Sequence, residues 1–173
     1  YIRQYRNHPA ILMWELGNEY NYHPEWFNGD INNWYSMLQR TATEVKRIDP
    51  TRKVATAHGE ISDLTPGILN RATAVDVWGI NIYRHTDSSA VIAAGRALRA
   101  HPDVQNRDIQ FYISETGTDS FDAGAGRENE EMQAQADRAI WENLMENADP
   151  QVFRGVTFMT WTDEFWKAGD PAV

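Results

Sequence analysis

Two glutamates in this sequence each close a short, mostly apolar run. Glu19 ends residues 11–19 (I-L-M-W-E-L-G-N-E), and Glu115 ends residues 109–115 (I-Q-F-Y-I-S-E). Such runs are typical of buried strands in a parallel sheet. Glycoside hydrolysis needs two carboxyl groups at one site, one to donate a proton and one to attack or to activate water. Glu19 and Glu115 are therefore our candidate catalytic pair.

The elements that must position these glutamates alternate along the chain. Apolar periodicity and turn signals predict strands at 11–16, 53–57, 75–83, 109–115 and 156–161, and helices at 31–48, 65–72, 88–100 and 128–147. This alternation indicates an α/β fold with a parallel sheet, either an open doubly wound sheet or a (β/α)8 barrel. Both architectures place their sites at the carboxyl ends of the strands. No G-x-G-x-x-G motif follows a predicted strand, which disfavours a dinucleotide-binding fold.

The composition narrows the classes of partner. A net charge of -9 argues against a nucleic-acid surface, and no apolar run is long enough to predict a membrane span. The absence of cysteine excludes disulfides, thiolate metal sites and a cysteine nucleophile. Trp26, Trp161 and Trp166 stand beside polar turn residues, where an indole ring could stack on a sugar. A carbohydrate is thus the expected partner.

Four motifs, in order along the chain, carry a resemblance to a known family. N-H-P-A-I-L-M-W-E-L-G-N-E at residues 7–19 resembles the acid/base strand of retaining β-glycosidases of the large (β/α)8 clan, most of all glycoside hydrolase family 2. That family includes β-galactosidases, β-glucuronidases and β-mannosidases. I-S-E ending at Glu115 is similar to its nucleophile strand 7. G-I-N-I-Y ending at Tyr83 is similar to strand 6, and T-F-M-T-W ending at Trp161 is similar to strand 8.

The resemblance implies a fold and a mechanism. Residues 1–173 would be a partial TIM-barrel catalytic domain, covering about strands 4 to 8, with the first three strand–helix units upstream of Tyr1. Glu19 would be the acid/base and Glu115 the nucleophile of a retaining β-glycosidase. Asn18 would bind the sugar 2-hydroxyl, and Trp161 would lie under the sugar. The family needs no metal and no cofactor for this chemistry.

Strand alternation adds further expectations. If Tyr83 points into the barrel mouth, so does Asn81, and if Glu115 does, Ile113 and Phe111 lie below it on the same face.

Two further polar residues have open roles. Glu15 is expected to point inward below Glu19 and to find a partner in His58, Asn81 or a basic residue of the upstream strands, unless a bulge near Gly17 reverses it. His58 either lines the sugar pocket or is structural. His58, Glu60 and His85 lack the spacing of a metal site.

Two departures from the family pattern leave the subfamily open. Glu15 stands where a small residue is expected, and T-G-T-D follows Glu115 in residues 116–119. An endo-glucanase or mannanase, or a transglycosylase of the same clan, would use the same two glutamates. A non-catalytic carbohydrate-binding fragment is the alternative from another class. The sequence leaves open the sugar, its linkage and the oligomeric state.

Overall fold

One parallel sheet organises the chain. The computed structural model describes residues 1–83 and 88–160. Within these ranges five strands pair in the order β1-β2-β3-β4-β7, and every pair is parallel. Neighbours in the sheet therefore follow chain order, as successive strand–helix units require. The strands are β1 (Met13–Asn18), β2 (Lys53–His58), β3 (Val77–Asn81), β4 (Gln110–Thr116) and β7 (Phe153–Phe158).

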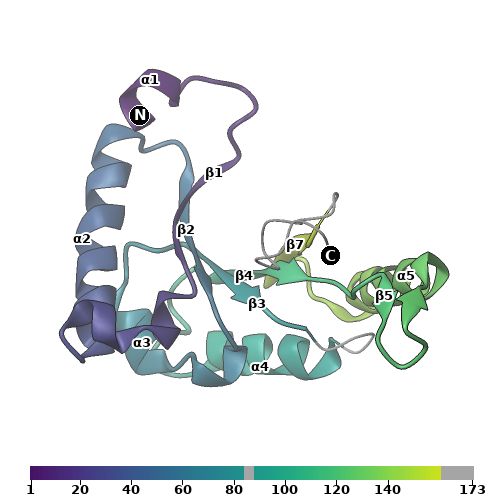
Figure 1. Cartoon of the computed structure of the whole chain (residues 1–173). Coiled ribbons are helices and arrows are strands. Elements are labelled where there is room, and N and C mark those ends of the chain that lie inside the picture. Colours follow the sequence, from purple (N-terminus) through teal and green to yellow (C-terminus); the bar gives the residue numbers. More distant parts are fainter. Residues whose placement is uncertain (84–87, 161–173) are drawn as a thin grey trace.

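Except for the short helix at the start of the chain, the α-helices of the described ranges cover one side of this sheet. They are α1 (Ile2–Tyr5), α2 (Ile31–Ile48), α3 (Pro66–Arg71), α4 (Ser89–Ala100) and α5 (Glu130–Asn147). Figure 1 shows α2, α3, α4 and α5 along the outside of the curved sheet, while its other side carries none of these helices. None of the described helices has the length and apolar character needed to cross a membrane. The α/β prediction is confirmed.

Short elements occupy the predicted loops. Three 3-10 helices, η1 (Tyr20–Tyr22), η2 (Pro24–Phe27) and η3 (Ile61–Asp63), follow β1 and β2. The long loop expected after Glu115 contains a small antiparallel hairpin of β5 (Phe121–Asp122) and β6 (Arg127–Glu128). The sequence signals gave the loops but not these short pieces, because two or three residues set up no periodic pattern.

The helix boundaries follow from capping residues that are legible in the sequence. Asp30 accepts a hydrogen bond from the Asn32 amide at 2.9 Å and so caps α2. Thr65 caps α3 just before Pro66, which stands at the first helical position. Both local signals place the helices where the sequence predicts them.

The hydrophobic core lies between the sheet and the helices. Trp78, Ile80, Phe111 and Ile113 are fully buried there. Phe111 packs against Phe153, with ring centroids 5.8 Å apart. These strand side chains face the helices, so the opposite face of the sheet is left for other residues.

His58 belongs to this core layer, and its environment differs from the sugar pocket considered in the sequence analysis. Its ring is 2% exposed, and Nε2 lies 2.9 Å from the hydroxyl of Tyr35 on α2. Nδ1 lies 3.4 Å from the Gly59 carbonyl. A proton on Nδ1 satisfies both contacts, because Nδ1 then donates to Gly59 and Nε2 accepts from Tyr35. His58 therefore joins the end of β2 to the helix layer.

The end of β1 is irregular, and a glycine makes this possible. Gly17 has φ +75°, and the pairing register of β1 with β2 shifts between Glu15 and Asn18. A Cβ atom at Gly17 would lie 2.7 Å from the Trp34 ring on α2. The bulge considered near Gly17 is thus present, and at this bulge the backbone of Gly17 lies close to Trp34 of α2.

Replacing Gly17 with alanine should lower the free energy of unfolding by about 2–5 kcal/mol, since positive φ costs a side chain about 1–2 kcal/mol and crowding adds about 1–3 kcal/mol. Gly29→Ala is the matched control, because Gly29 has φ +77° but nothing within 4 Å of the added Cβ. Chemical denaturation of both variants measures the difference. Equal losses would show that Trp34 does not restrict position 17.

His58 should make stability depend on pH. Burial lowers its pKa from 6.5 to about 4. Between these values the unfolded chain binds a proton that the folded chain does not, so the free energy of unfolding should fall as the pH drops from about 6.5 to about 4. His58→Gln should flatten this slope, so the variant and the wild type should differ in their pH dependence. Denaturant unfolding at several pH values measures both, and an unaltered slope in His58→Gln contradicts the assignment.

Candidate active site

Polar side chains from three strands meet at the carboxyl end of the sheet, and Asn81 at the end of β3 joins them. Its Nδ2 donates to Asn18 Oδ1 at 2.9 Å and to Glu19 Oε1 at 3.1 Å. Its Oδ1 accepts from the Ser114 hydroxyl at 2.6 Å. Asn81 is 4% exposed, so these partners replace water around its amide. One buried side chain thus ties Glu19 on one side to β4 on the other.

Glu115 lies in the same region, held by Tyr83. The Tyr83 hydroxyl donates to Glu115 Oε2 at 2.9 Å and lies 3.3 Å from the sulfur of Met159. Burial raises the pKa of Tyr83, and the hydrogen bond to Glu115 and the charges of Glu115 and Glu19 raise it further. Both glutamates therefore act on a single hydroxyl group. The structure brings together Asn18, Glu19, Asn81, Tyr83 and Glu115.

An extra residue in β4 directs Glu115 toward this cluster. Ile80 pairs with Ile113, but the next residue, Asn81, pairs with Glu115, so Ser114 is inserted between two ladder positions. The expectation that Ile113 lies below Glu115 on one face is therefore wrong. Ile113 faces the helices, while Ser114 and Glu115 both reach the polar cluster, because a bulge breaks the strict alternation of side chains.

Phe111 departs from the same expectation. It is fully buried, and a Cβ atom at Gly95 of α4 would lie 3.5 Å from its ring. Phe111 therefore packs under α4 and forms no floor beneath Glu115. Tyr112, which lies between Phe111 and Ile113 in β4, occupies the helix-free face instead.

Tyr112 crosses that face to reach Glu15. Its hydroxyl donates to Glu15 Oε2, although β2 and β3 lie between the two strands. Gly79 of β3 leaves the room, since a Cβ atom there would lie 2.7 Å from the Tyr112 ring. Partial burial of the Glu15 carboxyl group raises its pKa, and the charge of Glu115 adds to the effect. The partner of Glu15 is thus Tyr112, which the sequence analysis did not consider, rather than His58 or Asn81.

Some residues named in the sequence analysis cannot be placed in this site. Trp161, Trp166 and His85 lie outside the described residues. Among residues 1–83 and 88–160, no three His, Asp or Glu side chains gather closely enough to hold a metal ion. Ser114 and Tyr112 were missed by the sequence analysis, since only the bulge in β4 and the space above Gly79 give them their places.

Comparison with known proteins gives this arrangement a family. Residues 1–148 match the model of glycosyl hydrolases family 2, TIM barrel domain. A Formosa agariphila protein named as a β-glucuronidase is 40% identical over 55 residues, which are 31% of this chain and 7% of that protein.

Solved structures share the fold. A glucosidase from Croceicoccus marinus matches with a TM-score of 0.62 and 20% identity, over 86% of this chain and 33% of its own. A Bacteroides uniformis β-glucuronidase matches with a TM-score of 0.63 and 19% identity, over 92% of this chain and 20% of its own. The chain thus spans at most a third of the length of these relatives. It belongs to glycosyl hydrolase family 2, and its parallel sheet with outer helices is part of that family's TIM barrel domain.

Proposed function

We propose that this chain supplies the catalytic pair of a retaining β-glycosidase, with Glu19 as the acid/base and Glu115 as the nucleophile. The observation that carries the proposal is the shared polar cluster at the carboxyl end of the sheet. Asn81 holds Glu19 at 3.1 Å, and Tyr83 holds Glu115 at 2.9 Å. TIM-barrel enzymes place their catalytic residues at this end of the strands.

Among residues 1–83 and 88–160, the hydrogen bonds leave one oxygen of each carboxyl group free for chemistry. Whether Glu19 is ionised or protonated on Oε2, its Oε1 is an acceptor, and the amide nitrogen of Asn81 faces it. It occupies Oε1 of Glu19 and leaves Oε2 to carry the transferred proton. Tyr83 occupies Oε2 of Glu115 and leaves Oε1 to attack the anomeric carbon.

Asn18 is prepared in the same way. Its Oδ1 accepts the hydrogen bond from Asn81, and within the described part of the chain its own amide nitrogen has no acceptor and can donate to a ligand. We assign this donor to the sugar 2-hydroxyl, a contact that strengthens in the transition state. Trp161 keeps its proposed place under the sugar from its motif alone, and His58 is left out because it is buried against α2.

The reaction would proceed in two displacements. Glu115 attacks the anomeric carbon as the bond to the leaving oxygen breaks, and Glu19 gives its proton to that oxygen. Glu19 then removes a proton from water, which attacks the anomeric carbon of the glycosyl-enzyme and releases the Glu115 carboxylate. Two inversions retain the configuration. We propose a β-linked glycoside as substrate, in line with the glucosidase and β-glucuronidase names of the relatives.

Glu115→Ala in the protein that carries this chain should abolish hydrolysis of p-nitrophenyl β-glycosides. Azide should restore turnover, because it fits the space left by the carboxylate, and the product should be the inverted α-glycosyl azide, identified by NMR. Glu146→Ala removes an exposed carboxylate of α5 and should have no effect. A Glu115→Ala variant that keeps its activity, or that yields the β-azide, would contradict the nucleophile assignment.

Glu19→Ala should make the rate of hydrolysis depend strongly on the acidity of the leaving group. Loss of the proton donor should slow glycosides of poorly acidic alcohols by about 10²–10⁴-fold, while a 2,4-dinitrophenyl glycoside should still form the glycosyl-enzyme rapidly. Azide should then give the β-azide with retained configuration. Equal losses for all leaving groups would contradict the acid/base assignment. Kinetics with a series of aryl glycosides measures the dependence.

A further inference from the structure

A groove of about 630 Å³ lies along α2, and none of its lining residues belongs to the cluster around the two glutamates. Its volume falls within the range of roughly 300–1,000 Å³ that is usual for small-molecule sites. Residues of η2 and residues of α2 line the groove. The residues that matter below are Trp26, Asn28, Asn33, Met37, Arg40 and Arg71.

Helical spacing builds the wall. Asn33, Met37 and Arg40 stand four and then three residues apart on α2, so their side chains share one face of the helix. Arg71 is the last residue of the neighbouring α3 and adds a second guanidinium group from the side. The groove therefore presents two cations from two different helices.

Among the described residues, Arg40 and Arg71 lack the carboxylate partners that several other arginines have. Arg47, Arg52, Arg99 and Arg138 each pair with a carboxylate. Within residues 1–83 and 88–160, neither Arg40 nor Arg71 makes an ion pair or a side-chain hydrogen bond. In a chain of net charge -9, two unpaired guanidinium groups in one recess are an attractive position for an anion. Their planar forks match the geometry of carboxylates.

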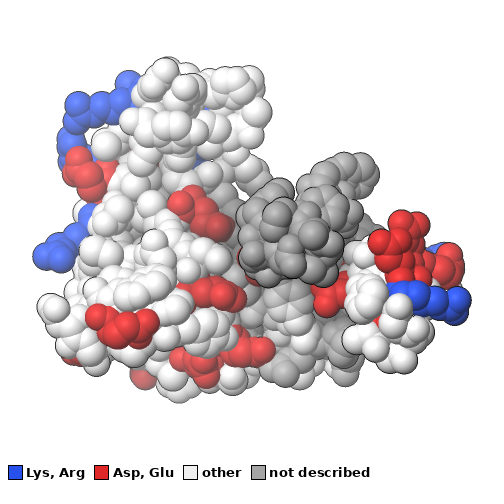
Figure 2. Space-filling view, in the orientation of Figure 1, with Lys and Arg blue, Asp and Glu red and all other residues white. Residues whose placement is uncertain are grey.

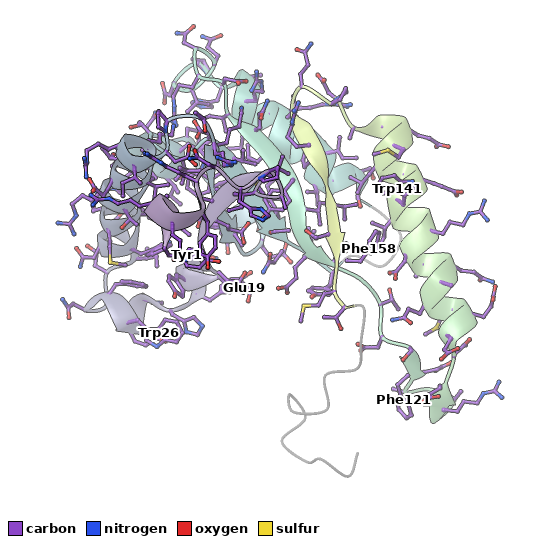
Figure 3. All side chains as sticks on the ribbon, turned by 90° about the horizontal axis from the view of Figure 1, so that it is seen from above. Tyr1, Glu19, Trp26, Phe121, Trp141 and Phe158 are labelled. Atoms are coloured by element: carbon purple, nitrogen blue, oxygen red, sulfur yellow. The ribbon has the colours of Figure 1, made fainter. Side chains whose placement is uncertain are left out.

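Trp26 adds a flat apolar surface at the η2 end. It is 60% exposed, although its ring is held firmly in place. The His23 imidazole stacks on it with ring centroids 3.8 Å apart and an interplanar angle of 7°, and Tyr20 meets it edge-on at 5.7 Å. Glu25 holds His23 in turn at 2.8 Å. In Figure 3, Trp26 stands at the rim of the molecule, in the loop that follows Glu19.

The combination favours a sugar acid over other anions. A nucleic acid needs a continuous basic stripe along its phosphates, whereas Figure 2 shows acidic side chains scattered across the face in view and basic ones at its margins. A uronate offers both a carboxylate for a guanidinium group and a C–H face for an indole ring. We propose that this groove is a second carbohydrate-binding site, separate from the catalytic pair, which takes an acidic glycan through Trp26, Arg40 and Arg71.

Affinity electrophoresis of the protein that carries this chain, in gels that contain polygalacturonate, tests the site. Polygalacturonate should slow the protein, and carboxyl-reduced polygalacturonate should slow it much less, because the arginines then lose their partner. Trp26→Ala, and separately the double variant Arg40→Gln with Arg71→Gln, should each weaken the affinity about tenfold or more, the effect expected for a charge-assisted pair or a stacked ring. Added salt should weaken the binding of the wild type more than that of the arginine variant.

Two matched controls lie on α5. Trp141 is 48% exposed, and Arg138 is an exposed arginine that is paired with Glu142. Trp141→Ala and Arg138→Gln should bind polygalacturonate as the wild type does. If the controls weaken binding as much as the groove variants, or if the groove variants bind like the wild type, the proposal is overturned. Equal retardation by polyglutamate would show simple ion exchange and would overturn it too.

Thermal unfolding of each variant establishes that it is folded. Should Trp26→Ala fail to fold, Trp26→Phe keeps a ring but presents a smaller surface, and it should show an intermediate loss of affinity. The arginine pair is tested independently of it. Because binding requires no turnover, a negative result here leaves the catalytic assignment standing, and a failed azide rescue leaves the groove standing.

Discussion

Asn81 has a donor end and an acceptor end, and the structure uses both of them. Its amide nitrogen must face Glu19 and its oxygen must face Ser114, since a carboxylate cannot donate. Leaving either end of a side chain that is 4% exposed without a partner would cost about 1–3 kcal/mol. The partners come from strands on both sides of β3. Regular strands would not deliver them, and both β1 and β4 break their pairing register close to this residue.

The two faces of the sheet carry different kinds of side chain. Toward the helices, large apolar side chains such as Trp78, Ile80 and Phe111 fill the core. On the opposite face, Gly79 lacks a side chain, and that space admits the ring of Tyr112 on its way to Glu15. The size of one residue in β3 therefore decides whether side chains can link β1 to β4. Asn81, which holds Glu19, lies on the same face of β3 as Gly79.

Much of this fold could be predicted from local sequence. The caps at Asp30 and Thr65 and the three-and-four spacing of α2 depend on neighbours in the chain, so they are legible without a structure. The position of Glu19 and Glu115 at the same end of the sheet could also be predicted, because parallel strands bring their carboxyl ends to one edge. The shared direction of Asn81 and Tyr83 could be predicted from strand alternation, which holds along β3 and continues to Tyr83 just after it.

The errors have a common physical origin. Alternation predicted Ile113 beneath Glu115 and failed, because the inserted Ser114 is a property of the pairing between two strands. The tertiary contact of His58 with Tyr35 is likewise invisible in sequence, since 23 residues separate them and only the packing of α2 on the sheet joins them. The same packing links Gly17 to Trp34, whose ring fills the space that a side chain at position 17 would need. Evolution therefore cannot vary these two positions independently: among related sequences, a side chain at 17 should accompany a smaller residue at 34, and the strand that carries Glu19 should covary with the helix behind it.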